Sequence, residues 1–515
     1  MAVAAVKAEN MSRNGTVTGS SQAAADAGLS VLRRGGNAVD AAVATALASC
    51  VADPCNTGLG GYGGYIVVQR RDLDAHCVQF PLWAPSTMTP ARLVRPYPEQ
   101  GPACSAVPNV VGGLARALAA FGRLSWSEIS RPAISLARDG VTANGTTLRA
   151  FAAHRHRPFV AECFEFDEAD RGGEATLIFH QPMLAATLET MATRGPQWFY
   201  DGPVGDAACR AWNEAGIDVP LEDWRGEAET VEVMKAARHQ IDGVVIDSAS
   251  LGFSGSACLF GTLTAAHRVS RRRPLSDPAA LVELATLMAA MWQYRFGVPG
   301  GNEFGDGDVA HWVERALAAR GGSDDGKLPA AGHTTHLNTA DAEGTLVAAT
   351  ITHGPAWFGG RWAIPGTGVI MNGGMHNFNR PVLVRRNGRY YGVSNMAPSV
   401  AARVIGGRVA IGSPGARRIP SNVGLAIARH AFASMGLQQA VSAGRIHAES
   451  RDRVTFEIAR LGPGIGTSLK QEFVAVGEEN WENYFGPLTA IRVNADGRYE
   501  VAVDDREIPG FSSGP

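Results

Sequence analysis

The sequence predicts an α+β protein, and two observations lead to that prediction. The first two thirds of its 515 residues contain several helix-like patterns, such as the long apolar segment 281–296. After Thr334 the pattern changes to short strands separated by turns, beginning with the strand-like run 337–352. A chain of this length can bury a large core. The sequence shows no internal repeat and no low-complexity tract.

Two helices are expected near the N-terminus. Ser20 and Ser21 are typical capping residues before segment 22–34, which ends at a pair of glycines. Segment 37–51 has alanine and valine on nearly all sides, so this second helix should be buried.

A glycine cluster at 58–64 follows the second helix and precedes a strand-like segment, 65–69. Glycine-rich turns cradle phosphate groups when they lead from a strand into a helix. The order here is helix, glycines, strand. We therefore expect backbone packed closely against backbone, not a nucleotide site.

The remaining elements follow from hydrophobic periodicity and turn signals. Helices are expected at 111–121, 126–139, 181–194, 421–435 and 438–443, and strands at 231–248 (with a turn at 242–243), 382–384, 400–405, 408–411, 455–460 and 490–501. Segment 300–328 is polar and glycine-rich, so it is expected to be a mobile connection that ends shortly before Thr334.

Charge and cysteine content narrow the function classes. The net charge is −2 and no basic stripe is present, which argues against nucleic-acid binding or an anionic membrane surface. The seven cysteines are scattered without CxxC spacing, which indicates reduced thiols. Segment 1–14 has no apolar signal core, and no later apolar run reaches the ~18 residues of a membrane span. We expect a cytoplasmic protein.

The sequence His333-Thr334-Thr335-His336 admits two interpretations. If the peptide bond between His333 and Thr334 is cut, Thr334 becomes a new N-terminus whose α-amine and hydroxyl supply base and nucleophile in one residue. The alternative is an ordinary β-branched pair at the start of a strand, and two threonines alone favour that alternative.

The histidines also suggest a metal site, since His333, His336, His353 and His376 lie in one part of the sequence. No carboxylate or cysteine completes a ligand set, so we expect no metal. Residues two apart on a strand share a face, so His336 should lie on the side of Thr334 as a hydrogen-bonded supporting residue.

A series of motifs then resembles the γ-glutamyltranspeptidase family of N-terminal-nucleophile hydrolases, from about residue 15 to 505. The motifs are Gly35-Gly36-Asn37-Ala38-Val39-Asp40, the glycine cluster 58–64, Thr334-Thr335-His336, Pro365-Gly366-Thr367-Gly368, Met396-Ala397-Pro398-Ser399, Gly412-Ser413-Pro414-Gly415 and Arg445-Ile446-His447. The resemblance implies a four-layer αββα sandwich with two mainly antiparallel sheets, and no cofactor or metal. It also implies a cut between His333 and Thr334, giving a large piece, 1–333, and a small piece, 334–515, intertwined in one catalytic domain.

The resemblance also implies roles for individual residues. Thr334 matches the nucleophile, and Thr352 matches a threonine that hydrogen-bonds it. Gly415 and Ala416 match a two-glycine oxyanion hole, in which backbone N–H groups are the donors, so alanine at the second position keeps its donor and only adds a methyl group. Ser394 matches a serine near the substrate carboxylate, and Asn395 replaces a second serine.

Three positions depart from the family pattern. Pro81 stands where an arginine grips the substrate α-carboxylate, segment 353–357 lacks the asparagine that meets the α-amine, and neutral Asn377 replaces an acidic residue. Hydrogen bonds to charged groups contribute about 1.5–3 kcal/mol each. Losing all three should weaken γ-glutamyl recognition by several orders of magnitude. The loop 378–394 also looks shorter than the lid-bearing loop of the family.

The expected pocket lining is aromatic and neutral-polar. It comprises Trp83, His353, Trp357, His376, Asn377 and Tyr62. Arg361, Arg417 and Arg418 are the candidates for a replacement positive charge.

We therefore expect a self-processing threonine amidohydrolase or acyltransferase that acts through an acyl-enzyme on a small-molecule acyl or amide substrate, with water as the main acceptor. Three alternatives stay open. They are a carbon–carbon bond hydrolase of secondary metabolism, a true γ-glutamyl enzyme with a rearranged pocket, and a non-catalytic scaffold. A homodimer is compatible with the sequence.

Overall fold

The computed structural model describes residues 15–94, 96–171, 174–226, 230–297, 309–318, 333–378, 384–404, 407–450, 452–479, 484–506 and 510–514. Its centre is formed by two sheets. The first has the order β23 (Gly510–Ser513), β1 (Thr16–Gly19), β10 (His333–Ala340), β11 (Leu346–Gly354), β2 (Gly63–Gln69), β3 (Ala75–Phe80) and β7 (Glu232–Lys235). The second has the order β22 (Tyr499–Val503), β21 (Thr489–Asn494), β17 (Gly407–Gly412), β16 (Ser399–Val404), β9 (Val244–Ser248) and β8 (Ala237–Ile241). Neighbouring strands within each sheet are antiparallel.

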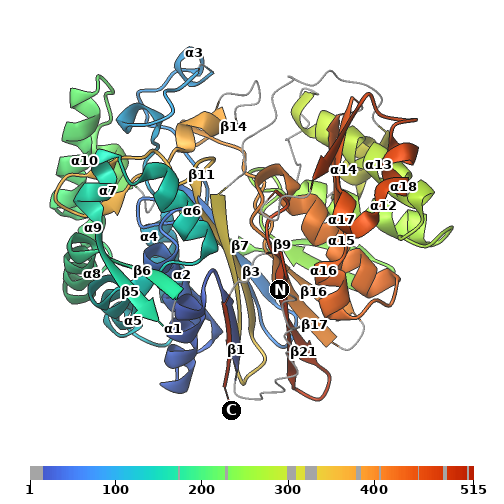
Figure 1. The fold of residues 1–515 in the computed structure, drawn as a ribbon, viewed down its shortest axis with the longest axis horizontal. Coiled ribbons are helices and arrows are strands. Elements are labelled where there is room, and N and C mark those ends of the chain that lie inside the picture. The colour runs from blue at the N-terminus through green and yellow to red at the C-terminus, as the bar shows by residue number, and fades with distance from the viewer. Residues whose placement is uncertain are drawn as a thin grey trace.

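The two sheets stack face to face and helices cover both outer faces (Figure 1). Strands β10 and β11 of the first sheet contact β17 of the second, and β11 also contacts β16. Helices α1 (Gln22–Arg33), α2 (Ala38–Ala52) and α4 (Val110–Phe121) cover the first sheet, and α5 (Trp126–Asp139) packs against α2. Helices α12 (Ser256–Ser270), α15 (Ile419–Phe432) and α16 (Leu437–Ser442) cover the second sheet. The α+β, four-layer αββα prediction is confirmed.

Helix α2 is buried along its whole length, as its composition predicts. It packs on β10 and β11 on one side and against α1, α4 and α5 on the other. Asn37 caps its start through the N–H groups of Val39 and Asp40, and the Asp40 carboxylate accepts from the Asn37 N–H. At its other end α2 delivers Asp53 to the neighbourhood of Thr334.

The glycine cluster allows close backbone contact, as expected. A Cβ on Gly60 would lie 2.2 Å from the carbonyl oxygen of Ile370, and a Cβ on Gly63 would lie 2.2 Å from that of Phe80. Only glycine fits at such separations.

The predicted strand 337–352 is wrong in detail. The segment is a hairpin in which β10 begins at His333 and a turn at 341–345 leads into β11. Segment 490–501 likewise divides into β21 and β22. Both errors arose because apolar runs continue across short polar turns.

The predicted connection 300–328 contains helix α14 (Val309–Ala318), so that part of the prediction is also wrong. The rest of the connection, including 321–326, lies outside the described residues. The long apolar helix is confirmed as α13 (Pro278–Gly297).

Other elements surround this centre. The further helices are α3 (Pro90–Leu93), α6 (Gly145–His154), α7 (Pro158–Cys163), α8 (Pro182–Arg194), α9 (Trp198–Asp201), α10 (Pro203–Glu214), α11 (Leu221–Arg225), α17 (Ile458–Leu461) and α18 (Pro463–Leu469). The further strands are β4 (Val141–Thr142), β5 (Glu165–Arg171), β6 (Glu174–His180), β12 (Ala363–Ile364), β13 (Val369–Ile370), β14 (Val384–Arg386), β15 (Arg389–Tyr391), β18 (Ile446–Ser450), β19 (Arg453–Glu457) and β20 (Ala475–Glu479). All seven cysteines are described, all are buried, and no disulfide joins any of them. Within the described ranges, no helix combines the length and the apolar character that crossing a membrane requires.

Candidate active site

Thr334 and Thr352 lie opposite each other on β10 and β11. The Thr334 hydroxyl donates to Thr352 Oγ1 over 3.1 Å, and the Thr352 hydroxyl donates to the carbonyl oxygen of His333 over 2.7 Å. The Gly354 N–H donates to Thr352 Oγ1 over 2.9 Å. Thr352 therefore links the hydroxyl of Thr334 to the carbonyl of the peptide bond that precedes Thr334.

The pairing of β10 with β11 is irregular at this peptide bond. His333 pairs with Gly354 while Thr334 pairs with Thr352, so one extra residue, His353, bulges from β11. Bulges of this kind re-aim side chains and occur beside active sites. Here the bulge coincides with the peptide bond predicted to be cut.

A second set of contacts holds the other face of β10. Thr335 donates to Asp53 Oδ2 over 3.0 Å, and the Asn56 side chain donates to Asp53 Oδ1 over 2.9 Å. His333 Nδ1 lies 3.2 Å from Asn56 Oδ1. Sequence reasoning missed Asp53 and Asn56, although both stand between a predicted helix end and the glycine cluster, where loop residues reach a site.

The histidines next to Thr334 are kept uncharged near neutral pH. Burial lowers the pKa of His336 to about 4, and its ring bonds Thr350 Oγ1 at 2.8 Å and Asn338 Oδ1 at 3.0 Å. Burial, together with the charges of Arg361 and Arg418, lowers the pKa of His333 to about 3. The predicted supporting role of His336 agrees with its two hydrogen bonds.

The turn at Gly415 and Ala416 has an unusual backbone. Gly415 has φ 125° and Ala416 has φ 53°, so both lie in the left-handed region. A Cβ on Gly415 would lie 2.5 Å from the carbonyl oxygen of Phe485. The expectation that alanine only adds a methyl group is therefore incomplete, since an L-residue pays roughly 1–2 kcal/mol for this conformation.

A pocket opens beside Thr334 and Thr352. Its other described lining residues are Tyr62, Gly354, Pro355, Asn377, Val393, Ser394, Asn395, Met396, Ala416, Arg417 and Ile419. Behind it, Arg295 of α13 donates to the backbone carbonyl of Ser394 over 3.0 Å and to that of Ser254. The pocket thus joins Thr334 to Ser394, Asn395, Asn377 and Tyr62, all named by the sequence prediction.

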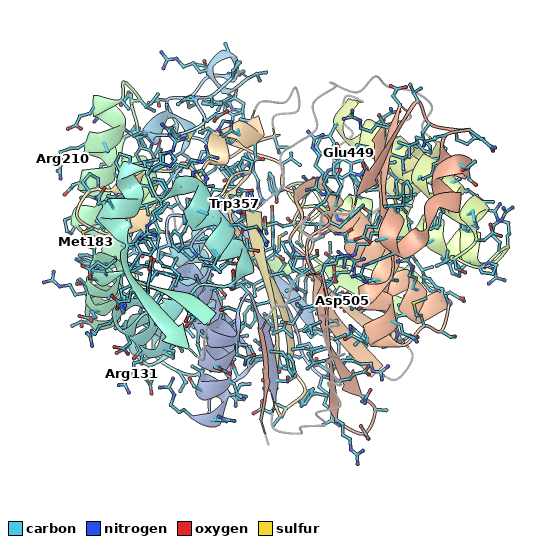
Figure 2. The ribbon with its side chains drawn as sticks, viewed as in Figure 1. Arg131, Met183, Arg210, Trp357, Glu449 and Asp505 are labelled. Atoms are coloured by element: carbon cyan, nitrogen blue, oxygen red, sulfur yellow. The ribbon has the colours of Figure 1, made fainter. Side chains whose placement is uncertain are left out.

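Four residues predicted for the lining (His353, Trp83, His376 and Trp357) and the predicted substrate-binding residue Pro81 are absent from the described lining of this pocket. His353 is buried with its ring against Gly58, because the bulge turns it away from Thr334. Trp83 is fully buried beneath the guanidinium of Arg389, and His376 packs edge-on against Tyr97. The carbonyl of Pro81 accepts from Asn109. The Trp357 ring lies 5.3 Å from the ring of His333 and is not part of the described pocket lining. Figure 2 shows Trp357 on the side of the molecule that contains α6.

A second, smaller cavity lies on the other side of Thr334. It is lined by Gly19, Ser20, Asp53, Asn56, Asn144, Thr146, Thr334, Thr335, His336, Pro414, Pro487 and Thr489. Thr334 lines both cavities, and the turn 414–416 contributes Pro414 to the smaller cavity and Ala416 to the pocket. Thr334 therefore borders two cavities that differ in charge, since Asp53 lines one and Arg417 the other.

This geometry agrees with a comparison against known protein families. A family model described as gamma-glutamyltranspeptidase matches residues 24–512. The chain belongs to the γ-glutamyltranspeptidase family. The family is part of the N-terminal-nucleophile hydrolase superfamily, whose members are hydrolases or transferases.

Similar proteins include acylases and glutathione hydrolases. Acylase ACY 1 proenzyme of Pseudomonas sp. (strain V22) is 28% identical over 534 residues, which cover 92% of this chain and 89% of the acylase. Glutathione hydrolase 3 of Arabidopsis thaliana is 28% identical over 402 residues, and these span 72% of this chain but only 61% of that protein. The crystal structure of cephalosporin acylase from Bacillus halodurans shares the fold, with a TM-score of 0.82 at 20% identity over 100% of this chain and 98% of that one.

The three arginines that the sequence offered as replacement cations lie in different surroundings. Arg361 lies 3.7 Å from Glu99, and Arg418 is buried over the ring of Tyr484. Of the three, Arg417 lines the pocket beside Thr334. In this member of the γ-glutamyltranspeptidase family, the pocket cation thus comes from the turn next to Ala416, not from the position of Pro81.

Proposed function

We propose that the chain is a self-processing threonine amidohydrolase or acyltransferase that acts through an acyl-enzyme. The observation that carries the proposal is the hydrogen-bonded series Thr334–Thr352–His333 carbonyl in a chain of this family. An ordinary strand pair has no need of a hydroxyl that bridges a neighbouring hydroxyl and the preceding carbonyl.

Self-cleavage would begin with attack of Thr334 Oγ1 on the carbonyl carbon of His333. The C–N bond to Thr334 breaks, its nitrogen takes the proton from the hydroxyl, and an ester joins the two residues. Water then hydrolyses the ester and leaves the carboxylate of His333 and the free amine and hydroxyl of Thr334. Thr352 supports this step because its hydroxyl polarises the carbonyl under attack.

In the mature protein, the Thr334 amine would accept the proton as its hydroxyl attacks a substrate amide. The backbone N–H groups of the turn 415–416 would stabilise the oxyanion, and loss of one such donor typically costs ~10²–10³ in rate. The amine of the substrate leaves, an acyl ester remains on Thr334, and water or another amine releases the acyl group.

The proposed substrate is not an ordinary γ-glutamyl amide. Pro81 provides no guanidinium, segment 353–357 provides no asparagine, and the pocket residue Asn377 is neutral. The acylase relative, which aligns over nearly all of both chains, supports an acylase-type substrate.

Intact mass spectrometry of the purified protein tests this proposal. We expect two pieces, one ending at His333 and one beginning at Thr334, and we expect Thr334→Ala to remain a single chain. The matched control Thr335→Ala alters the neighbouring hydroxyl, which bonds Asp53 instead, and should still be cut. A wild-type chain that stays whole on long incubation would refute the proposal.

A γ-glutamyl specificity is the second candidate, because glutathione hydrolases are among the relatives. The turnover rate of γ-glutamyl p-nitroanilide distinguishes this candidate from the proposed acylase-type specificity. We expect this rate to be low compared with that of an acyl anilide that lacks the α-amine.

A further inference from the structure

Asp53 is placed next to the predicted cleavage site by the end of helix α2. This helix packs against β10, and Figure 1 shows it beside the first sheet. Asp53 follows the last residue of the helix, and its N–H donates to the carbonyl of Ser49 in the last helical turn. The side chain is only 4% exposed. Burial and the negative end of the helix dipole both disfavour a carboxylate here, so its hydrogen bonds must stabilise it.

The two carboxylate oxygens of Asp53 reach both sides of the peptide bond between His333 and Thr334. Oδ2 accepts from the hydroxyl of Thr335 over 3.0 Å. Oδ1 accepts from the side-chain amide of Asn56 over 2.9 Å, and Asn56 Oδ1 lies 3.2 Å from His333 Nδ1. Residues two apart on a strand share a face, so the two residues that flank Thr334 are held from one side.

The direction of these hydrogen bonds follows from the carboxylate at one end. An ionised carboxylate accepts hydrogen bonds and donates none, so the amide nitrogen of Asn56 faces Asp53 and its oxygen faces His333. The His333 ring must then donate through Nδ1–H. Burial lowers the pKa of His333 to about 3, so the ring is neutral and carries one proton. The series therefore fixes both the tautomer and the orientation of the ring that precedes Thr334.

The same loop also holds the neighbouring strand at the cleavage site. The carbonyl of Asn56 accepts from the N–H of His353, the residue that bulges from β11. The ring of His353 lies against Gly58, where a Cβ would collide with it. Segment 53–58 thus contacts β10 before and after the scissile bond and contacts β11 at the bulge. These contacts can set the position of the His333 carbonyl relative to Thr334.

We propose that Asp53 and Asn56 are positioning residues for self-cleavage, which hold the carbonyl carbon of His333 in reach of the Thr334 hydroxyl. This inference rests on the proposed function, because it takes the bond between these two residues to be the one that is cut. Thr352 bonds the attacking hydroxyl and the carbonyl oxygen, whereas the Asp53 series holds the residues on either side. Small misplacements of reacting atoms cost large factors in rate, so both sets of contacts are needed.

The test measures the rate of self-cleavage by intact mass at intervals during cell-free synthesis of the full chain. Asp53→Asn leaves one oxygen where two donors now bind, so we expect it to be cut roughly tenfold to a hundredfold more slowly than the wild type. Thr335→Ala keeps the contact through Asn56 and should be slowed less, which is why it is still cut on long incubation.

An exchange of the two side chains distinguishes positioning from a general loss of stability. Asn56→Asp alone sets two carboxylates side by side and should slow cleavage by about tenfold or more. Adding Asp53→Asn restores one carboxylate and one amide in reverse order. The amide oxygen can then accept from Thr335, its nitrogen can donate to the carboxylate, and that carboxylate can accept from His333. The double variant should be cut about tenfold faster than Asn56→Asp; a double variant that is no faster would overturn the inference.

Asp341→Asn is the matched control, because Asp341 is also buried and adjoins β10 at the opposite end of the strand. Its carboxylate accepts from three backbone N–H groups. The substitution should lower Tm, measured in the uncut Thr334→Ala background, and leave the rate of self-cleavage unchanged. Rates that follow Tm across all of these variants would show that Asp53 and Asn56 only stabilise the fold, which also overturns the inference.

The wild-type chain separates the two possible failures. If it stays whole, the proposed function is refuted. If it is cut, and a folded Asp53→Asn protein is cut at the same rate, the inference is overturned while the proposed function stands. If Asp53→Asn does not fold, the comparison of Asn56→Asp with the double variant decides instead.

Discussion

At the scale of single residues, the Thr352 hydroxyl takes part in three hydrogen bonds, to Thr334, to Gly354 and to the carbonyl of His333. A hydroxyl has one donor and two acceptor positions, so this group is fully used. Thr352 thus fixes both partners of the proposed self-cleavage.

Thr352→Val keeps the shape of the side chain and removes those bonds, which leaves the Gly354 N–H without its acceptor. We expect self-cleavage to slow by roughly tenfold or more, given the cost of an unsatisfied buried group. A time course of intact mass after refolding measures the rate. Thr352→Ser retains the hydroxyl and should cut at a rate close to wild type; equal rates for the valine and serine variants would contradict the assigned role.

Ala416 adopts a left-handed backbone that sequence inspection could not reveal, because φ is not encoded by residue type alone. Ala416→Gly should raise the free energy of unfolding by up to about 1 kcal/mol. Glycine removes the strain of the left-handed backbone, and this gain exceeds the additional conformational entropy that a glycine loses on folding. The matched control is Ala119→Gly on the exposed face of α4, which should lower it by about 1 kcal/mol. Chemical unfolding of both variants in the uncut Thr334→Ala background decides the sign.

At the scale of elements, the glycine cluster brings β2 against β3 and against the segment around Ile370. Gly63→Ala would place a methyl group 2.2 Å from the Phe80 carbonyl, so backbone must move. We expect a loss of about 1–3 kcal/mol and a lower Tm. Gly252 has no atom within 4 Å of its would-be Cβ, and Gly252→Ala should leave Tm nearly unchanged; similar losses in both variants would show that close packing is not the cause.

The elements also show what sequence could and could not predict. Capping residues and an all-round apolar composition predicted α1 and α2 well, since both signals are local. The pocket lining was predicted less well, because a bulge at His333 and Thr334 breaks the alternation on which strand arguments depend. His353 was therefore misplaced. Arg417 was one of three arginines named from the sequence, and the structure was needed to single it out as the one that lines the pocket.

At the scale of the whole molecule, the order of motifs was enough to predict the family and its layers, because that order is specific even where each motif is weak. The residues expected to contact a γ-glutamyl substrate depart from the family pattern, and the lining of the pocket had to be found in the structure. The αββα architecture was thus predictable, whereas the way in which the pocket obtains its positive charge was not.

Buried histidines make the stability of the whole fold depend on pH. The pKa values of His333 and His353 are lowered to about 3 and that of His336 to about 4, chiefly by burial, against about 6.5 when unfolded. Since the folded values are the lower ones, stability is complete above about pH 6.5 and falls as the pH decreases toward 4.

Urea unfolding of the Thr334→Ala chain at pH 7.5 and pH 5.0 measures this effect. We expect each of the three histidines to contribute a loss of roughly 1–2 kcal/mol at the lower pH. His353→Leu removes one of these groups at a position packed against Gly58, and should reduce the loss by that amount. An unchanged pH dependence in His353→Leu would contradict the assignment.

If Thr334 acts as proposed, the arrangement of strands in the first sheet constrains when it can become active during synthesis. Strand β10 is held between β11 and β1, and β1 in turn pairs with β23, which is translated last of the four. A ribosome-bound chain that has emerged only as far as Thr334 lacks β11 with Thr352 and the turn at Ala416. On that proposal, the fold delays the appearance of a free Thr334 amine until translation has passed Thr352 and Ala416, and a chain that ends before them would stay uncut.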